Sequence, residues 1–247
     1  MTGALVTGAA SGLGRFLHRA LGGEGLTRQN AASLLEGPGA ELIVHCAADA
    51  RRAATAAERS AQRRANVELT EKLCRMPHAR FVLMSTSDVY AEDGGPWGEA
   101  GPLNPRNPYA EDKVAAEAAV QALAKRPLVL RLGTLLGPDA RPNALSRLVD
   151  GTAMTLAAES RFSWLPHEDV LAFLTLALDR GLEGTYNVVP SRSATLAEAA
   201  RALGRTPAWG AHLYRASEAD GAKARALCPA LSRSALENAM TFAKQRA

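Results

Sequence analysis

Tyr109 and Lys113 are four residues apart in a segment with helical spacing, which places both side chains on one face of a helix. The rise between them along the helix axis is about 6 Å, so both can serve one site. An ammonium group near a phenol stabilises the phenolate and lowers the phenol pKa, which makes tyrosine an acid or base near neutral pH. The pair therefore predicts proton transfer, although the same spacing is common in purely structural helices.

Hydroxyl side chains follow an apolar run at 80–84, in the segment STSDVY at 85–90. A hydroxyl at the carboxyl end of a strand can hydrogen-bond a reacting oxygen and hold it against a tyrosine. Thr86 precedes Tyr109 by 23 residues, a gap that a strand end, a loop and a helix start together account for. We predict that Thr86 orients the reacting oxygen and that Ser87 and Asp88 contact the substrate.

A glycine-rich segment, TGAASGLG at 7–14, follows the first apolar run and leads directly into a helical pattern. Glycines there allow a tight turn and a close approach to a pyrophosphate, while the helix N-terminus offers free N–H groups. This context predicts a dinucleotide site. Its predicted contacts are Gly8, Ala10, Ser11, Gly12, Leu13 and Gly14, together with Ala47 and Ala48 in the segment HCAAD at 45–49.

The acidic residue that holds a ribose 2′-hydroxyl in many such sites is missing, because the segment at 24–30 reads EGLTRQN. Arg28 lies near the expected position instead. A guanidinium suits a 2′-phosphate, so the sequence slightly favours NADP over NAD. The alternative is an exposed arginine without any ligand contact.

The elements that must position these groups alternate along the first half of the chain. Runs rich in Val, Leu and Ile predict buried strands, and helical patterns fill the gaps between them. The predicted strands lie at 3–6, 41–45, 80–84 and 127–132, and the helices at 13–21, 51–75 and 109–126. This order predicts an α/β fold with a Rossmann-type doubly wound parallel sheet, which binds ligands beyond the carboxyl ends of its strands.

The second half, at 134–247, predicts a small substrate-side lobe interleaved with the core at 1–133. A helix at 167–180 and a strand at 185–189 belong to it. A long loop at 91–108, rich in Gly and Pro, predicts a functional flap, in which Trp97 either covers a sugar or base or simply packs the flap down.

Composition bounds the class of protein. The 247 residues carry a formal net charge of +4, which fits an anionic small molecule better than nucleic acid, since nucleic-acid binding usually needs a clustered basic face. The densest basic run, Arg51, Arg52, Arg59, Arg63 and Arg64, is interpreted as a solvated helix face. Three widely spaced cysteines give no disulfide framework, and neither a signal segment nor a membrane span is predicted, so the expected compartment is the cytoplasm.

Several further side chains have weaker signals. Arg131, Arg141 and Arg161 lie where a diphosphate clamp would be useful, and each is equally well explained as surface. His167, Glu168 and Asp169 open a helix, where acidic groups favour the helix dipole, so we predict capping and no metal site.

Taken in order, these motifs resemble the extended short-chain dehydrogenase/reductases, also called the NAD-dependent epimerase/dehydratase family. The resemblance also includes ANVELTEKLC at 65–74, NPYAEDK at 107–113, LRLGTLLGP at 130–138, LPHEDV at 165–170 and GTYNVVPS at 184–191. It implies that Thr86 is the catalytic hydroxyl, Tyr109 the acid/base and Lys113 the residue that binds the nicotinamide ribose and tunes Tyr109. It further implies a structural relay role for Asn66, a nucleotide-sugar substrate and a homodimer.

The chain departs from the family pattern in ways that bear on the reaction. Ser11 stands where extended members usually have the second glycine, and the segment between Gly14 and Glu41 is short. In the family's sugar 4,6-dehydratases an Asp-Glu pair follows the catalytic threonine, whereas Ser87 and Asp88 follow Thr86 here. We therefore expect an epimerase or reductase that moves a hydride at a secondary alcohol or ketone carbon. The alternatives are an NADPH-dependent ketoreductase for a non-sugar molecule and a non-catalytic dinucleotide-binding sensor.

Overall fold

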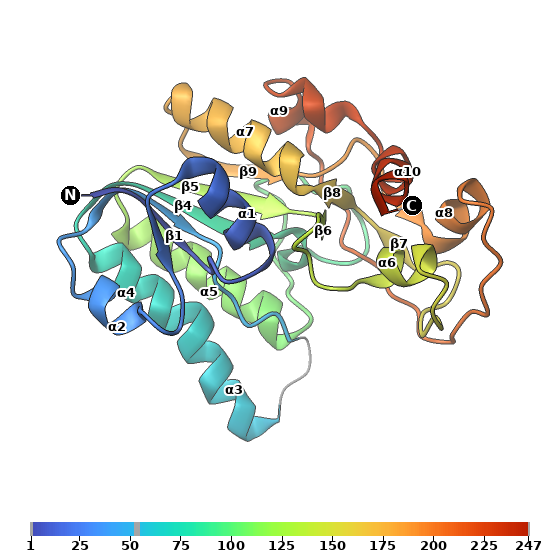
Figure 1. Cartoon of the computed structure of the whole chain (residues 1–247), viewed down its shortest axis with the longest axis horizontal. Coiled ribbons are helices and arrows are strands. Elements are labelled where there is room, and N and C mark those ends of the chain that lie inside the picture. Colours follow the sequence, from blue (N-terminus) through green and yellow to red (C-terminus); the bar gives the residue numbers. More distant parts are fainter. Residues whose placement is uncertain (1, 52–54, 247) are drawn as a thin grey trace.

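A computed structural model describes residues 2–51 and 55–246 of the chain (Figure 1). Within these residues, six parallel strands form one sheet in the order β2-β1-β3-β4-β5-β9. Its strands are β1 (Thr2–Thr7), β2 (Glu24–Leu26), β3 (Ala40–His45), β4 (His78–Thr86), β5 (Pro127–Leu132) and β9 (Gly184–Val188). The predicted Rossmann-type doubly wound sheet is confirmed.

The strand order reverses between β1 and β3, and this reversal decides where a ligand can enter. After β1 the chain pairs β2 on one side and then returns to pair β3 on the other. The carboxyl ends of the central strands are in register, since Thr7 pairs with His45 and Thr86 pairs with Leu132. The crevice beyond these ends is where doubly wound sheets bind nucleotides.

Helices cover both faces of the sheet (Figure 1). On one face α1 and α7 pack through Leu17, Phe173 and other apolar side chains, and on the other α4 and α5 pack through residues such as Leu73 and Val120. The helices are α1 (Gly12–Leu21), α2 (Ala31–Leu35), α3 (Ala56–Arg63), α4 (Leu69–Arg75), α5 (Pro108–Leu123), α6 (Ala144–Val149), α7 (His167–Asp179), α8 (Leu196–Ala202), α9 (Ala222–Arg225) and α10 (Ala235–Arg246). Shorter helical turns are η1 (Arg64–Glu68), η2 (Ser87–Val89) and η3 (Pro229–Ser232).

A separate apolar cluster lies beside the sheet and includes Trp164, Leu145 and Phe242. It joins α6, α8 and α10 to two small two-stranded sheets, which are formed by β6 with β8 and by β7 with β10. These strands are β6 (Thr134–Leu136), β7 (Arg161–Phe162), β8 (Trp164–Pro166) and β10 (Ala194–Thr195). The expectation that the helix and strand at 167–189 belong to the substrate-side lobe is wrong, because β9 completes the main sheet and α7 packs on its face. The division at residue 133 stays a prediction.

The predicted helix at 51–75 begins later and is not uniform. It starts at Ala56, after a capping box between Thr55 and Glu58, and contains the π-helical turn η1. The interpretation of its arginines as a solvated face is wrong for Arg59, because this side chain makes two short contacts, of 2.7 and 2.8 Å, with the buried carboxylate of Asp112. Arg52, which belongs to the same basic run, lies outside the described residues.

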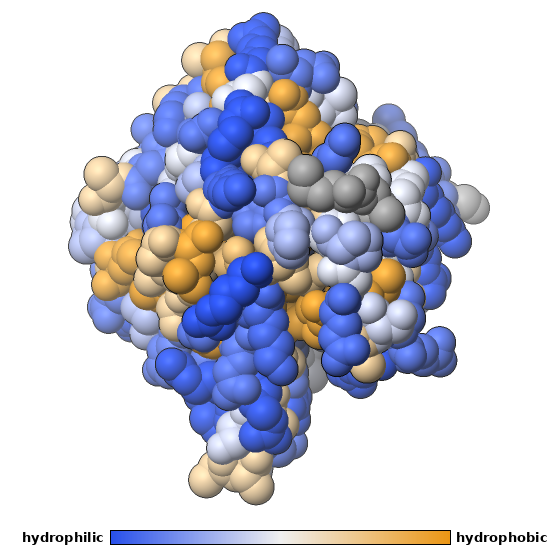
Figure 2. Space-filling view, turned by 90° about the vertical axis from the view of Figure 1, so that its left-hand side faces the viewer, coloured by the Kyte–Doolittle hydropathy of each residue, from blue (hydrophilic) through white to orange (hydrophobic). Residues whose placement is uncertain are grey.

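Polar side chains cover most of the face seen in Figure 2, and apolar groups form separate patches between them. No helix in the described part of the chain is long and apolar enough to span a bilayer.

Candidate active site

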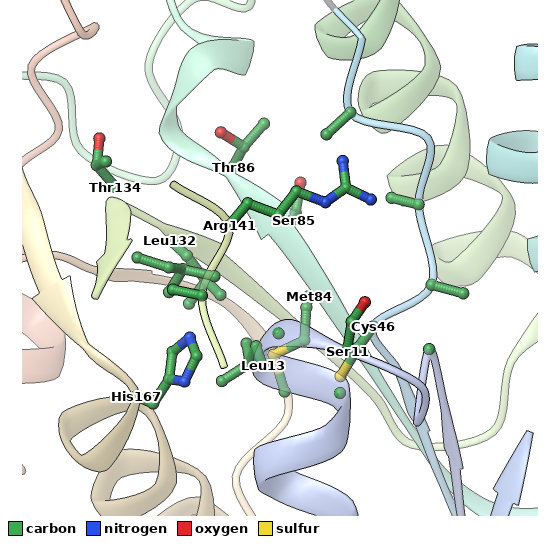
Figure 3. Close-up of a pocket in the computed structure, with 18 of the residues that line it drawn as sticks. Ser11, Leu13, Cys46, Met84, Ser85, Thr86, Leu132, Thr134, Arg141 and His167 are labelled. Carbon is green, nitrogen blue, oxygen red and sulfur yellow. The ribbon is translucent and has the colours of Figure 1, made fainter. Parts of the chain in front are cut away.

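A cavity of about 490 Å³ opens beyond the carboxyl ends of β1, β3, β4 and β5 (Figure 3). The predicted site residues on its wall are Gly8, Ser11, Gly12, Leu13, Gly14, Ala47, Ala48, Thr86, Tyr109, Lys113 and Arg141. No Asp or Glu side chain is among the described residues of this wall, whereas Lys113 and Arg141 are. The cavity is therefore electrostatically suited to an anionic ligand.

The glycine turn fits closely against its neighbours. Gly8 has φ +71°, a conformation that favours glycine, and a Cβ there would lie 3.1 Å from the backbone of Ala47. A Cβ on Gly14 would lie 2.4 Å from the carbonyl oxygen of Gly8, so α1 starts directly against the turn. The first residues of this helix line the cavity, and a helix N-terminus at that place fits a dinucleotide diphosphate.

A buried chain of hydrogen bonds supports the turn from behind. Thr7 Oγ1 accepts the backbone N–H groups of Cys46 and Ala47 and lies 2.7 Å from His45 Nδ1. His45 Nε2 lies 2.9 Å from the hydroxyl of Thr70. Burial, and then the charge of Lys113, lower the pKa of His45 to about 3, so its ring is neutral. Because Thr7 Oγ1 already accepts two N–H groups, it interacts with Nδ1 of His45 by donating its own hydroxyl proton. Nδ1 is then the acceptor, and we assign the single ring proton of the neutral imidazole to Nε2.

Thr86 ends β4 and faces the cavity (Figure 3). Its Oγ1 accepts the backbone N–H of Asp88 at 3.2 Å, which fixes the oxygen at the start of η2. This bond uses a lone pair and leaves the hydroxyl proton free to rotate toward a ligand oxygen. The neighbouring Ser85 is turned into the protein, where it donates to Glu117 at 2.5 Å.

Tyr109 and Lys113 lie in the first turns of α5, as predicted. Asn107 caps this helix by accepting the N–H of Ala110, and Pro108 occupies its first turn. The Nζ of Lys113 donates to the carbonyl oxygen of Met84 at 2.7 Å and lies 5.9 Å from the centre of the Tyr109 ring. Burial lowers the pKa of Lys113 to about 8, so its ammonium is a weakly solvated charge beside the phenol.

Asn66 lies behind the cavity wall rather than on it. Its Oδ1 accepts the N–H of Asp49 at 2.7 Å, and its Nδ2 donates to Asp49 O and to Asp112 Oδ2 at 3.1 Å each. These bonds hold the loop after β3, which carries Ala47, Ala48 and Ala50 to the cavity. Asn66 therefore couples that loop to α5.

Cys46 also lines the cavity, but as a neutral thiol. Burial raises its pKa to about 12, against a smaller opposite effect of Lys113. A thiol that holds its proton at neutral pH is a poor nucleophile.

The family model for NAD dependent epimerase/dehydratases matches residues 4–188. The chain belongs to this epimerase/dehydratase family. The prediction of a nicotinamide-dependent enzyme of the short-chain dehydrogenase type is thereby confirmed at the level of the family. A curated relative, the low-salt glycan biosynthesis protein Agl12 of Haloferax volcanii, is 30% identical over 122 residues, which cover 44% of this chain and 39% of that protein.

Solved epimerase/dehydratase structures share the fold over nearly the whole chain. UDP-glucuronic acid 4-epimerase from Bacillus cereus, in complex with UDP-glucuronic acid and NAD, has a TM-score of 0.77 at 20% identity, with 99% of this chain and 100% of that chain covered. MoeE5 in complex with UDP-glucose and NAD has a TM-score of 0.80 at 21% identity, with coverages of 98% and 99%. TunA, an NAD dependent NDP-hexosamine 5,6-dehydratase of tunicamycin biosynthesis, has a TM-score of 0.78 at 21% identity, with coverages of 100% and 99%.

Several predicted residues of this epimerase/dehydratase lie away from the cavity. Ala10 is exposed beyond the glycine turn, where its carbonyl accepts a hydrogen bond from Arg15. Arg28 is exposed in the turn after β2, near the glycine turn but not on the cavity wall. The solved structures of the Bacillus cereus epimerase and of MoeE5 contain NAD, and the expected preference for NADP gains no support from them.

Of the predicted substrate-binding residues, one lies on the cavity wall and the others lie away from it. Arg141 reaches over the cavity (Figure 3), whereas Ser87 is buried in η2. Asp88 faces a second hollow and lies 3.4 Å from the hydroxyl of Tyr214. Trp97 donates its indole N–H to Ala91 O and pairs with the segment at 218–220. Arg161 lies on β7, where it donates to Ser193. The roles of these residues stay predictions.

Arg131 does not line the cavity, so it cannot take part in the predicted diphosphate clamp. Its guanidinium forms a buried two-pronged ion pair with Glu117, with a shortest contact of 2.6 Å, and donates to the hydroxyl of Tyr90 at 2.6 Å. Tyr90 donates in turn to Asn187. This network ties the loop at 91–108 to β5, β9 and α5, because Arg131 also donates to Glu99 O.

Sequence reasoning missed four polar residues on the cavity wall, namely Ser85, Thr134, Asn143 and His167. Asn143 caps α6, and its local signal is the spacing to Ser146, with which it forms a capping box. His167 does begin a helix as expected, yet its ring lies inside the protein and faces the cavity (Figure 3). The available signal is a histidine within an otherwise apolar strand-to-helix segment.

Proposed function

We propose that this protein moves a hydride reversibly at a secondary alcohol or ketone carbon of a nucleotide-activated or modified sugar, with a nicotinamide dinucleotide as hydride carrier. The observation that carries this proposal is the single cavity that contains the glycine turn, Thr86, Tyr109 and Lys113. A pure dinucleotide binder has no need of a phenol beside a buried ammonium.

The side chains have separate tasks in this reaction. Thr86 donates its hydroxyl proton to the substrate oxygen and holds the carbon in place. Tyr109, as phenolate, takes the hydroxyl proton of the carbinol. A nicotinamide dinucleotide held against the glycine turn would accept the hydrogen of the C–H bond together with both electrons, so that the alcohol would become a ketone. Lys113 stabilises the phenolate through its charge. In the reverse direction the same proton returns to the oxygen.

An epimerase or a reductase fits the cavity better than a dehydratase. Elimination of water needs a further acid and base near the sugar. The wall, as far as the structure describes it, carries no carboxylate, and Asp88 faces the hollow near Tyr214 instead. Hydride transfer to a nicotinamide and its return to the opposite face of the ketone would require no acid or base beyond Tyr109.

A sugar nucleotide is the substrate class that the observations favour. Arg141 adds positive charge at the mouth of the cavity. The pKa of Asp49 is lowered mainly by a hydrogen bond from Arg51, and the charge of Arg141 makes a smaller contribution in the same direction. The solved structures of similar fold contain UDP-sugars and NAD. We therefore propose NAD as the first cofactor to test, with NADP compared in parallel.

The test is turnover with a panel of UDP-sugars and simple ketones, followed by NMR of the sugar and by absorbance of the reduced nicotinamide. Conversion of one sugar epimer into another with no net change in nicotinamide indicates an epimerase. Stoichiometric oxidation of NADH or NADPH indicates a reductase. Dinucleotide binding without turnover of any compound in the panel would overturn the catalytic proposal in favour of a sensor.

A further inference from the structure

His167 is the least explained polar group in the cavity wall. His167 is fully buried, and neither its Nδ1 nor its Nε2 has a hydrogen-bond partner within the described structure. A buried polar group without a partner is destabilising, and such groups are rare in folded proteins. A ligand that supplies the missing partner would remove this penalty.

The surroundings of the ring are shaped for a histidine that faces the cavity. The ring lies 5.3 Å from that of Phe16 on α1, and Figure 3 shows it directed into the space beside Leu13 and Leu132. Gly137 leaves room for it, because a Cβ at that position would lie 2.2 Å from Nδ1. The loop that carries Gly137 is attached to α1 by ion pairs from Arg15 and Arg19 to Asp139, at 3.1 and 3.2 Å.

The ring is neutral in this setting, because burial lowers the pKa of His167 despite the opposing charges of Glu168 and Asp139. A neutral imidazole has one N–H donor and one acceptor nitrogen. Phe16, whose ring contacts His167, belongs to α1, and the N-terminal N–H groups of this helix suit a diphosphate. The donor of His167 therefore lies close to the place where negative oxygen atoms are expected.

We propose that His167 donates a ring N–H to the diphosphate of the bound dinucleotide, as a binding residue that completes the site opposite the glycine turn. This inference rests on the proposed function, since it requires that the cavity hold a dinucleotide. The unpaired ring then has the character of a functional group that destabilises the unliganded fold and is satisfied only on binding.

The first experiment compares binding and stability in three variants. His167→Leu removes both nitrogens at similar volume, His167→Gln keeps an N–H donor, and His212→Leu changes an exposed histidine as a matched control. We expect calorimetry to show about 10- to 30-fold weaker NAD⁺ binding for His167→Leu, partial recovery for His167→Gln and no change for the control. We also expect the melting temperature of unliganded His167→Leu to rise, because a burial penalty is removed.

A merely structural histidine gives the opposite pattern. In that case His167→Leu lowers the melting temperature, or leaves it unchanged, without a selective loss of affinity, and the inference is wrong. If His167→Leu fails to fold, the unmodified protein still decides the question through NMR of its ring.

That second measurement follows the ring Cε1–H signals of ¹³C-labelled histidine during titration. We expect NAD⁺ and ADP-ribose, which share the diphosphate, to shift the His167 signal alike. A shift with NAD⁺ but not with ADP-ribose overturns the assignment to the diphosphate, and binding of both without any shift overturns the role of His167 altogether. If the unmodified protein binds no dinucleotide at all, the proposed function is wrong as well. This outcome distinguishes a failure of the proposed function from a failure of the role assigned to His167 alone.

Discussion

The two walls of the cavity differ in how their polar groups are held. On the wall built by β1, β3, β4 and α5, protein partners fix the polar groups: Lys113 donates to Met84 O, and behind the wall His45 hydrogen-bonds both Thr7 and Thr70. The opposite wall, built by the loop at 133–143 and the start of α7, carries the exposed Arg141 and the unpartnered ring of His167. The first wall is organised before a ligand arrives, whereas the second is completed by the ligand.

The proposed catalytic side chains Thr86, Tyr109 and Lys113 lie on the organised wall. A catalytic proton transfer depends on geometry fixed in advance, because displacements of about 1 Å can lower a rate about 100-fold. Affinity for a large ligand tolerates side chains that find their partner only on binding. Substitutions of Tyr109, Lys113 and Arg131, on or behind the organised wall, should therefore affect the rate or the fold, and substitutions of His167 and Arg141 on the opposite wall should affect mainly the dissociation constant.

The largest effect is expected for Tyr109→Phe, which removes the phenol oxygen and keeps the ring. Loss of a positioned acid/base lowers kcat by about 10²- to 10⁴-fold. The dissociation constant of the dinucleotide should stay within about twofold, since the backbone contacts at Gly8 and Gly12 are unchanged. Steady-state kinetics and calorimetry measure the two quantities. Tyr186→Phe, a change in the core on β9, is the control, and unchanged turnover in Tyr109→Phe would exclude the proposed proton transfer.

Arg131→Met tests whether the network behind the organised wall supports the fold. The substitution leaves the buried carboxylate of Glu117 without its ion-pair partner, and breaking such a pair destabilises by about 3–5 kcal/mol. Urea denaturation should show this loss. The matched variant Arg141→Met, on the opposite wall, should change the free energy of unfolding by less than about 0.5 kcal/mol. The double variant with Glu117→Gln should recover part of the loss, and equal effects of Arg131→Met and Arg141→Met would contradict the comparison.

The pKa of Lys113 predicts opposite pH dependences for activity and stability. Because burial lowers this pKa from 10.5 to about 8, the unfolded chain binds more protons than the folded one between these values. The destabilising effect of the ammonium is thus fully present below pH 8 and disappears as the pH rises toward 10.5. Activity needs the charge, so kcat/KM should fall about tenfold per pH unit above pH 8.

Two measurements check the behaviour of Lys113. Lys113→Met should melt a few degrees higher than the unmodified protein at pH 7, a difference that shrinks above pH 8. Its pH–rate profile should lose the alkaline fall along with most of the activity. A melting temperature that drops at every pH would show that the hydrogen bond to Met84 O outweighs the burial of the charge.

Asn66→Ala should have a smaller effect that is shared between stability and binding. The change leaves the N–H of Asp49 without its acceptor, which destabilises by about 1–3 kcal/mol. Because the Asp49 loop carries Ala47 and Ala48, we expect dinucleotide affinity to fall severalfold with little change in kcat. Asn66→Asp, which keeps an acceptor for Asp49 but faces Asp112 with a like charge, separates the two bonds. A loss confined to kcat would contradict this supporting role.

The sequence predicted the organised wall far better than the opposite one. Apolar runs and helical spacing identify the strand ends and the face shared by Tyr109 and Lys113, because both patterns are local. The pairing of Arg131 with Glu117 depends on how α5 packs against β5, and no spacing rule contains that information. The missing partners of His167 likewise appear only once Gly137 and Phe16 surround the ring. Tertiary packing alone decides which arginines face a ligand and which are buried in ion pairs.

The smallest effect is expected at Arg28, which lies outside the cavity wall but beside the glycine turn. Ala9 in that turn donates its N–H to the carbonyl oxygen of Leu26, which precedes Arg28 by two residues. An exposed guanidinium contributes little to binding and is screened by salt. If it meets a 2′-phosphate, Arg28→Ala should weaken NADP binding by about 5- to 10-fold at low salt and leave NAD unchanged. Arg75→Ala, at the opposite end of the sheet, controls for net charge. Equal losses for both dinucleotides would place Arg28 on their shared atoms, and no loss for either would make it a surface residue.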